Sequence, residues 1–406
     1  MARFLFAWEL GVGLGHVLPL AQLARPLVER GHELALVLKD LSSARAVLGA
    51  LADSPRMTLW QAPVWLLPLQ GQAPAVSYAE LLHRAGYLDA GRLRGLVQGW
   101  RQLFDAIRPD LLLIDHAPTA LLAAQGLPLR RVMVGNGFFQ PPAGAPMPGF
   151  LDDDAISPLR LAQTEALALA TCNAVLVAEG RPALNALHEL LAVDQNFLLT
   201  WPQLDPYGHG PEGRPGGDYW GPLPVSVQGV PALWPDGDGP ALLAYLKGDY
   251  AALEPVLQQL ARAPCRTLAH VVGLNAVLRQ RWSGQRLRFA TEPVQMSDAL
   301  SQAAAVLCHG GAGTVAAALQ AGRPLLLLPM HGEQAATARR VQAAGLGACL
   351  RPNEVPVKLK STLTRLLADN ALTGRVQAFA AARGAAPGAD VSDALARRCE
   401  QLLAAA

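Results

Sequence analysis

Two loops of this 406-residue sequence combine histidine with several glycines, and each follows a short apolar run. The first is GVGLGH, which ends at His16, and the second is HGGAGT, which begins at His309. Histidine titrates near neutral pH, so it can take a proton from a hydroxyl. Glycine lets the backbone approach a ligand closely. These two loops are the first candidates for chemistry.

His16 is a candidate general base if a carboxylate holds its other ring nitrogen, because that contact fixes the tautomer and stabilises the imidazolium. Asp115, in PDLLLIDHAPT, ends a predicted strand, and ligands of α/β sheets bind beyond the strand carboxyl ends. Its neighbour His116 is expected to point to the other side of the backbone. Two structural alternatives stay open: GVGLGH as a plain strand–helix turn, and Asp115 as the N-cap of the next helix.

The second loop has the composition of a diphosphate site. Glycines precede a helix that is predicted to begin at Thr314, and a helix N-terminus offers unpaired N–H groups and partial positive charge. Thr314 can cap this helix or bond a phosphate oxygen, and His309 can donate to a phosphate. Neither loop fits a standard nucleotide fingerprint. GVGLGH has His16 in place of the third glycine of the dinucleotide motif, and HGGAGT has no Walker GK[ST].

The elements that must position these residues alternate between strand and helix patterns. Strands are predicted at residues 4–8, 34–38, 111–114, 131–134, 241–246, 267–272, 304–308 and 325–328. Helical patterns lie between most of them, and a last helix is predicted at 391–406. This alternation is typical of an α/β fold with parallel sheets covered on both faces.

The length suits two domains. Residues 202–240 are dense in glycine and proline, which indicates a linker and loops rather than a core. The predicted organisation is an N-terminal domain at 1–214, a second domain at 215–385 and a C-terminal helix at 386–406. That helix is expected to pack back toward the N-terminal domain.

Composition argues against several classes of protein. The 34 basic and 32 acidic side chains give a net charge of +2, without the basic footprint of nucleic-acid binding. The five cysteines form no CxxC pair, so disulfide and metal-site interpretations are weak and a cytoplasmic location is expected. The N-terminus is not a convincing signal peptide, and no stretch approaches about 18 uninterrupted apolar residues, so no membrane-spanning helix is predicted. Peripheral membrane contact is compatible with the sequence, and the oligomeric state is not indicated.

The run HGGAGTVAAALQAGRPLLLLPMHGEQAATARRVQAAGLG, residues 309–347, resembles the donor-binding signature of the family-1, GT-B-fold glycosyltransferases. The matching parts are the HGG and GT of the loop, Gly322 and Pro324, and the pair Glu333 and Gln334. GHVLPLAQLARPLVERGHEL resembles the opening pattern of the same family. The resemblance covers nearly the whole chain, most weakly at 150–300. It implies a GT-B fold, in which two Rossmann-like domains face a central cleft with their parallel sheets.

The resemblance also implies roles. His16 would deprotonate the acceptor hydroxyl and Asp115 would orient His16. The implied donor-binding residues are His309, Gly310, Gly311, Gly313 and Thr314 for the diphosphate, Glu333 and Gln334 for the sugar, and Gln295 for the nucleobase.

The implied reaction inverts the anomeric centre and moves a hexose from a UDP- or dTDP-sugar to a hydroxyl of a small-molecule or lipid-like acceptor. It needs no cofactor and no metal, because the helix dipole and side chains stabilise the departing diphosphate. The acidic run Asp152–Asp154 is accordingly interpreted as a solvated charge run. Phe138 and Phe139 follow a predicted strand end and are expected at the lip of the acceptor cleft.

Three positions depart from the family pattern. Ala317 replaces the acidic residue that binds the ribose, an acid that some relatives with deoxythymidine donors also lack. Thr337 replaces an asparagine. Lys247 stands where a Gly-Ser turn is usual, so it is either an extra cation for the diphosphate or a surface lysine. Two alternative functions stay open: a nucleotide-sugar epimerase of the same fold, and a non-catalytic nucleotide-sugar-binding protein.

Overall fold

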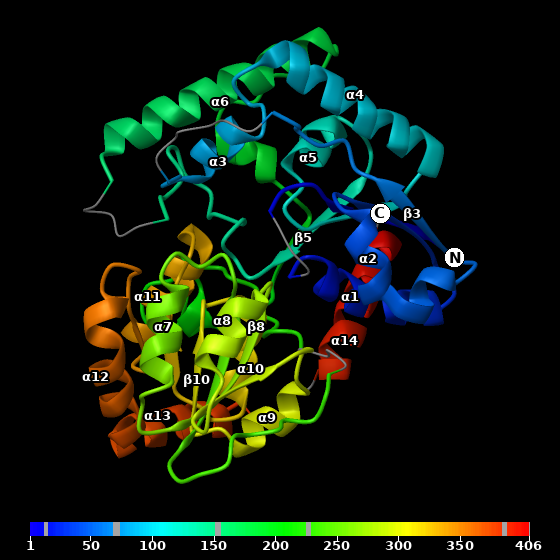
Figure 1. Ribbon diagram of the computed structural model, residues 1–406. Coiled ribbons are helices and arrows are strands. Elements are labelled where there is room, and N and C mark those ends of the chain that lie inside the picture. Colours follow the sequence, from blue (N-terminus) through cyan, green and yellow to red (C-terminus); the bar gives the residue numbers. More distant parts are fainter. Residues whose placement is uncertain (12–14, 68–73, 151–155, 225–228, 384–387, 406) are drawn as a thin grey trace. The chain divides into compact units, whose positions relative to one another are not determined.

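The computed structural model describes residues 1–11, 15–67, 74–150, 156–224, 229–383 and 388–405. Its contacts divide the chain into two compact units, Met1–Leu223 with Gly388–Ala406, and Pro224–Pro387. Each unit is built around one six-stranded parallel sheet with helices on it (Figure 1), which confirms the predicted α/β class.

The sheet of the first unit has the strand order β3-β2-β1-β4-β5-β6. Its strands are β1 (Arg3–Trp8), β2 (Glu33–Leu38), β3 (Met57–Gln61), β4 (Leu111–Ile114), β5 (Arg130–Gly135) and β6 (Gln195–Leu198). The central strands read FLFAW and LLLI and are buried throughout, as expected for strands covered on both faces. The chain order reverses between β1 and β4, which pair in parallel with Ala7 opposite Ile114. That reversal is where α/β sheets bind ligands.

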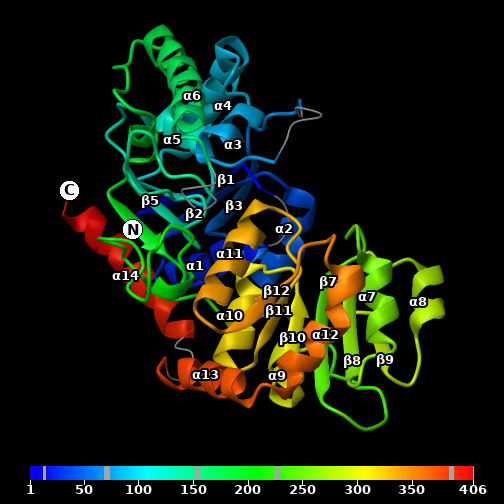
Figure 2. The ribbon, with the colours of Figure 1, turned by 90° about the vertical axis from the view of Figure 1, so that its left-hand side faces the viewer.

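The helices on this sheet form two groups, which lie apart from each other in both views (Figures 1 and 2). The first group is α1 (Val17–Glu29), α2 (Leu41–Leu48) and α14 (Gly388–Ala404), and the second is α3 (Tyr78–Arg84), α4 (Ala90–Ile107), α5 (Pro118–Ala124) and α6 (Pro158–Ala178). Short 3-10 turns lie at η1 (Gly49–Asp53), η3 (Leu187–Leu191) and η4 (Pro202–Leu204).

The helix α14 comes from the far end of the chain and packs on α1. Arg30 forms an ion pair with Asp393 at 2.5 Å, and His32 lies 2.8 Å from Glu400. The C-terminal helix therefore belongs structurally to the first unit.

Among the described helices, α6 has the length and apolar composition that could cross a membrane. It is 21 residues long, and 28% of its most apolar window is buried. Core helices of globular domains meet the same criteria, so this finding by itself assigns no membrane span.

The sheet of the second unit has the order β12-β11-β10-β7-β8-β9. Its strands are β7 (Ala241–Lys247), β8 (Arg266–Val272), β9 (Leu287–Ala290), β10 (Ala305–Cys308), β11 (Leu325–Leu327) and β12 (Gly347–Cys349). Counted from its own first strand, this order is the same as in the first unit. Its reversal lies between β7 and β10, which pair with Tyr245 opposite Cys308.

The helices of the second unit again form groups. Their bounds are α7 (Leu253–Leu260), α8 (Ala276–Trp282), α9 (Met296–Gln302), α10 (Ala312–Gln320), α11 (Gly332–Ala343), α12 (Val355–Ala368) and α13 (Asn370–Ala381). Contacts join α10 to α9 and α13, and join α7 to α8 and α12. The helix α10, which follows the second glycine loop, packs on β10 and β11.

The division between the units lies after Leu223, not between residues 214 and 215 as the sequence indicated. The residues beyond 214 stay with the first unit because they extend its sheet. The N–H of Leu198 in β6 donates to Asp218 O at 2.9 Å, and Trp220 N–H donates back to Leu198 O at 3.0 Å. Glycine and proline density indicated a loop correctly, but it carried no information on burial.

Candidate active site

His16 and Asp115 lie at the carboxyl ends of β1 and β4, where the first sheet reverses. His16 is the N-cap residue of α1, and Asp115 directly follows β4. The His16 Nδ1 and Asp115 Oδ2 atoms are 3.0 Å apart, and only 12% and 10% of the two side chains are exposed. The carboxylate accepts from Nδ1–H and so fixes the tautomer and the orientation of the ring. The predicted contact is present.

Gly11 makes room for the His16 ring. Its φ is 87°, and a Cβ built on Gly11 would lie only 2.3 Å from His16 Nε2, so both the backbone conformation and the space require glycine. Lys39 Nζ donates to Gly11 O at 2.8 Å and holds the same turn. Residues 12–14 of this loop lie outside the described residues.

Aromatic rings surround His16. Trp8 stacks on it with centroids 5.3 Å apart and planes 19° apart, and Phe139 lies at 5.9 Å. Trp8 Nε1–H donates to Leu10 O at 2.6 Å, which satisfies the polar atom of that ring. An apolar surrounding excludes water and strengthens the electrostatic contact between His16 and Asp115.

Glu9 is a buried carboxyl group beneath the same loop, with 2% of the residue exposed. It accepts hydrogen bonds from Trp100 Nε1 at 2.8 Å and from Thr119 N at 2.7 Å. Burial raises the pKa of Glu9 to about 7, although these hydrogen bonds act in the opposite direction. In the sequence Glu9 only interrupts an apolar run, so no signal there indicated this position.

His116 lies beside His16, with ring centroids 6.3 Å apart, so its predicted orientation away from the site is wrong. The alternation of side chains holds within a strand, but His116 lies beyond the end of β4 and has a φ of 47°. Its ring stacks on Phe139 with centroids 3.6 Å apart. Phe139 therefore contacts both histidines.

Phe138 does not lie at a surface. Only 3% of it is exposed, and its ring stacks on Phe150 with centroids 4.4 Å apart. The expectation that Phe138 lines the lip of an acceptor cleft is wrong, because consecutive residues of the turn point in different directions and this one fills the core of the unit.

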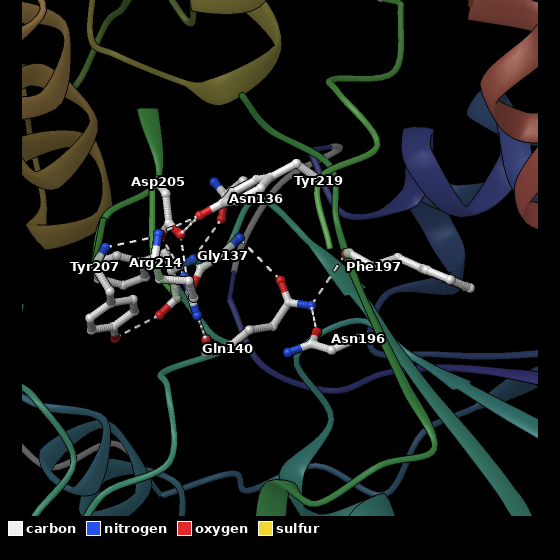
Figure 3. Close-up of polar contacts among 10 residues, drawn as sticks. Asn136, Gly137, Gln140, Asn196, Phe197, Asp205, Tyr207, Arg214 and Tyr219 are labelled. Carbon is white, nitrogen blue, oxygen red and sulfur yellow. Dashed lines mark hydrogen bonds and ion pairs between the residues drawn. The ribbon is translucent and has the colours of Figure 1, made fainter. Parts of the chain in front are cut away.

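The turn that carries Phe139 is held by a buried polar network (Figure 3). Arg214 donates to the carbonyl oxygens of Gln140 and Gly137, on both sides of Phe139. Tyr207 Oη–H donates to Phe138 O at 3.0 Å. The residues 205–214, expected in a linker and loop region, thus fix the backbone of the turn that carries Phe139.

Asp205 neutralises the arginine of this network. Arg214 Nε lies 2.5 Å from Asp205 Oδ2, and none of the Asp205 side chain is exposed. Burial alone would raise the pKa of Asp205, but the hydrogen bond and charge of Arg214 outweigh it and hold the pKa below its ordinary value. Tyr219 also donates to Asp205, at 2.5 Å. A Cβ on Gly213 would lie 2.1 Å from Tyr219 Oη, so this glycine permits close packing.

His309 of the second unit is also buried, with 5% exposed, but its partners are backbone atoms. Nδ1–H donates to Leu328 O at 2.7 Å, and Nε2 accepts from Lys247 N–H at 2.9 Å. Burial lowers its pKa. Because both nitrogens are occupied, the expectation that His309 donates to a phosphate does not hold in this structure. The residue instead ties β10 to the ends of β7 and β11.

The helix after this loop begins at Ala312, not at Thr314, and Gly311 is its N-cap residue. Gly313 and Thr314 are therefore in the first helical turn, where backbone N–H groups lack helical acceptors. Gly310 has a φ of 93°. Gly311 is exposed, and no described atom lies within 4 Å of a Cβ built on it. Within its unit, the predicted diphosphate loop is open to a ligand.

The predicted sugar-binding pair lies in the first turn of α11. Glu333 is half-buried. Gln334 is buried, with 7% exposed, and its Oε1 accepts from Met330 N at 2.8 Å. That oxygen therefore supports the turn between β11 and α11. Thr337 is also buried. Its hydroxyl donates to Glu333 O, so the side chain of this unusual threonine makes its hydrogen bond within α11.

Three further positions singled out in the sequence lie in or next to elements of the second unit. Gln295 is an exposed N-cap residue of α9, and its backbone N–H donates to Val230 O at 2.8 Å. Lys247 ends β7 with an exposed side chain, and its charge helps to lower the pKa of His309 after the larger effect of burial. Ala317 lies in α10 and brings no carboxylate to the site.

No group of three or more His, Cys, Asp and Glu side chains that could hold a metal occurs among the described residues. The acidic run Asp152–Asp154 lies outside the described residues, so its interpretation as a charge run stays a prediction.

Comparison with known proteins finds similarity to glycosyltransferases. Residues 285–402 match the family described as "Erythromycin biosynthesis protein CIII-like, C-terminal domain". The chain is 24% identical over 282 residues to a PGL/p-HBAD biosynthesis glycosyltransferase of Mycobacterium tuberculosis. That match covers 65% of this chain and 64% of the relative, so the chain spans slightly less than two thirds of the relative's length.

Solved structures resemble the chain along its whole length. The glycotransferase of kitacinnamycin has a TM-score of 0.72 at 18% identity and covers 99% of both chains. Spinosyn rhamnosyltransferase SpnG complexed with thymidine diphosphate has a TM-score of 0.66 at 18% identity, over 98% of this chain and 100% of that one. At such identities the likeness shows a shared fold. By fold and by sequence similarity, this chain is similar to the family-1 GT-B glycosyltransferases.

Proposed function

We propose that this protein is an inverting, metal-independent glycosyltransferase that moves a hexose from a UDP- or dTDP-sugar to a hydroxyl of a small-molecule or lipid-like acceptor. The observation that carries the proposal is the hydrogen bond of 3.0 Å between His16 Nδ1 and Asp115 Oδ2 at the reversal of the first sheet. A histidine held by a carboxylate in an aromatic surrounding is suited to take a proton from a hydroxyl.

In the proposed reaction, His16 Nε2 takes the acceptor hydroxyl proton while the acceptor oxygen attacks the anomeric carbon. The bond from that carbon to the diphosphate oxygen breaks, and attack opposite to it inverts the configuration. Asp115 stabilises the imidazolium. The exposed first turn of α10 offers N–H groups and positive dipole charge to the departing diphosphate, which is the role that a metal would otherwise have.

The choice between the two donors depends on Ala317, which leaves the ribose 2′-hydroxyl without a carboxylate partner from α10. A deoxyribose has no such hydroxyl, and the spinosyn rhamnosyltransferase described above was solved with thymidine diphosphate. A dTDP-sugar is therefore the first donor to test.

The test combines binding and turnover. UDP, dTDP and GDP are compared by thermal shift in the presence of EDTA, where a ligand at about 100 times its Kd adds about 2.7 kcal/mol of stability. Nucleotide sugars are then incubated with and without a hydroxylated acceptor, and the anomeric configuration of the product is read by NMR. We expect UDP or dTDP to shift the melt and an inverted product to form only with acceptor. A shift by GDP alone would contradict the donor assignment, and conversion of the sugar without acceptor would indicate an isomerase.

A further inference from the structure

His116 is a buried polar side chain next to His16 that the proposed reaction does not use. It is 5% exposed, and neither Nδ1 nor Nε2 has a hydrogen-bond partner among the described residues. Buried polar atoms without partners destabilise a fold and are few in native proteins. A ring with two such atoms, 6.3 Å from His16, therefore requires an explanation.

The backbone of His116 adds a second unfavourable feature. Its φ of 47° is left-handed, a region that residues with a Cβ seldom adopt. The conformation is fixed by Leu10 N–H, which donates to His116 O at 3.1 Å. Backbone strain of this kind persists where the surroundings enforce it, and it concentrates at functional sites.

The surroundings of the ring are aromatic. Phe139 covers one face, with centroids 3.6 Å apart and planes 12° apart, and Tyr78 lies 6.0 Å away. Burial holds the pKa of His116 well below its ordinary value, and the charges of His16 and Lys39 act in the same direction. At neutral pH the ring is thus uncharged, with one N–H donor and one acceptor nitrogen.

The contact between His116 and Phe139 is built by the fold. Phe139 lies between Phe138 and Gln140, whose carbonyl oxygens accept hydrogen bonds from Tyr207 and Arg214 (Figure 3). The turn is therefore held on both sides of the ring that covers His116.

We propose that His116 is an acceptor-binding residue, whose imidazole exchanges a hydrogen bond with a polar group of the acceptor and so places the neighbouring hydroxyl at His16. The inference rests on the proposed function and deepens it. The inference predicts a flat, mainly apolar acceptor, because the site is lined by aromatic rings. It also predicts a second hydroxyl or carbonyl beside the reacting hydroxyl, because the two imidazoles are 6.3 Å apart.

Two coumarins that differ by one vicinal hydroxyl test this selectivity. The probes are 6,7-dihydroxycoumarin and 7-hydroxycoumarin, each with the dTDP- or UDP-sugar that the wild type uses. We expect the wild type to favour the dihydroxy probe in kcat/KM by about tenfold, the effect of one hydrogen bond. His116→Phe, which keeps the stack on Phe139 but has no ring nitrogen, should lower that ratio to about one, mainly through acceptor KM.

Stability supplies a second readout that needs no substrate. Because His116→Phe removes two unpartnered nitrogens, we expect it to melt at or above the wild-type temperature. His83→Phe is the matched control: His83 is buried in the same unit, and its Nε2 lies 2.9 Å from Thr164 O. That control should melt lower and keep the wild-type acceptor ratio. His116→Asn, which tolerates a left-handed backbone better, should also lose the ratio.

The inference is overturned if both His116 variants keep the tenfold ratio, or if His116→Phe melts as far below wild type as His83→Phe does. Failure of the proposed function has a different signature. In that case His16→Ala would retain sugar transfer, or no nucleotide would shift the melt, whatever residue stands at position 116.

Discussion

The two sheets reverse their strand order at the same point, and each places a histidine there with a different set of partners. After β1 and β4, His16 is bonded to the carboxylate of Asp115 among aromatic rings. After β7 and β10, His309 is bonded to two backbone groups. The first arrangement suits proton transfer. The second suits a rigid loop in front of an exposed helix N-terminus. The same residue type at the same topological position can therefore have different roles, depending on whether its ring nitrogens bond a carboxylate or backbone groups.

Substitution of His16 tests the difference between the two histidines most directly. We expect His16→Ala to lower kcat for sugar transfer by about 10²–10⁴-fold, because the proposed general base is lost. The thermal shift by dTDP or UDP should be unchanged, since the proposed diphosphate loop is in the other unit. Turnover is measured by product formation, and the shift by differential scanning fluorimetry. Wild-type turnover in this variant would remove His16 as the base.

Substitution of Arg214 tests how much the buried polar network stabilises the first unit. Arg214→Met leaves Asp205 buried without its cation, and breaking such a pair costs about 3–5 kcal/mol. Urea unfolding followed by tryptophan fluorescence measures the loss. The control is Arg45→Met, whose ion pair with Asp53 is 64% and 66% exposed, so a change of about 0–1 kcal/mol is expected. Equal effects of the two variants would show that the network contributes little.

His309→Ala tests the structural role of the second histidine. It leaves Leu328 O and Lys247 N–H without their side-chain partner, which should destabilise the protein by about 1–3 kcal/mol. The melting temperature without ligand should fall, and the nucleotide shift should weaken with it. If the ligand-free melt is unchanged while the nucleotide shift disappears, His309 contacts the donor directly and the contrast with His16 narrows.

The smallest effect is expected at Lys247. If its exposed ammonium attracts the diphosphate, Lys247→Met should raise the nucleotide Kd by about fivefold at low salt, and the difference should shrink at high salt. Calorimetric titration at two salt concentrations measures this, with Lys360→Met as a control for the loss of one exposed cation. An unchanged Kd would make Lys247 a surface lysine.

Regular patterns in the sequence predicted the inner strands of both sheets, but not the outer strands β3, β6, β9 and β12. All eight predicted strands agree with the structure to within one residue at each end, and the contact between His16 and Asp115 is present. Both follow from local rules, because buried parallel strands are apolar runs and their carboxyl ends meet at one edge.

The features that the sequence could not predict are long-range. His309 takes its partners from Leu328 and Lys247, which lie far along the chain. Arg214 appeared in a stretch whose composition indicated a linker, yet it is buried and donates to the carbonyl oxygens of Gln140 and Gly137, 74 and 77 residues earlier in the chain. Glu9 looked like an interruption of a strand until α4 and α5 supplied its hydrogen-bond donors. No local pattern encodes such pairings.

The division of the chain has a practical consequence for hybrid enzymes. The backbone passes from the first unit to the second after Leu223 and returns before Gly388. A chimera that takes a donor half from a relative therefore needs two junctions. A single cut near residue 215 would separate Tyr219 from Asp205 and replace α14, whose Asp393 pairs with Arg30. Such a hybrid would disrupt contacts within the first unit, whereas grafting residues 224–387 would leave the first unit intact.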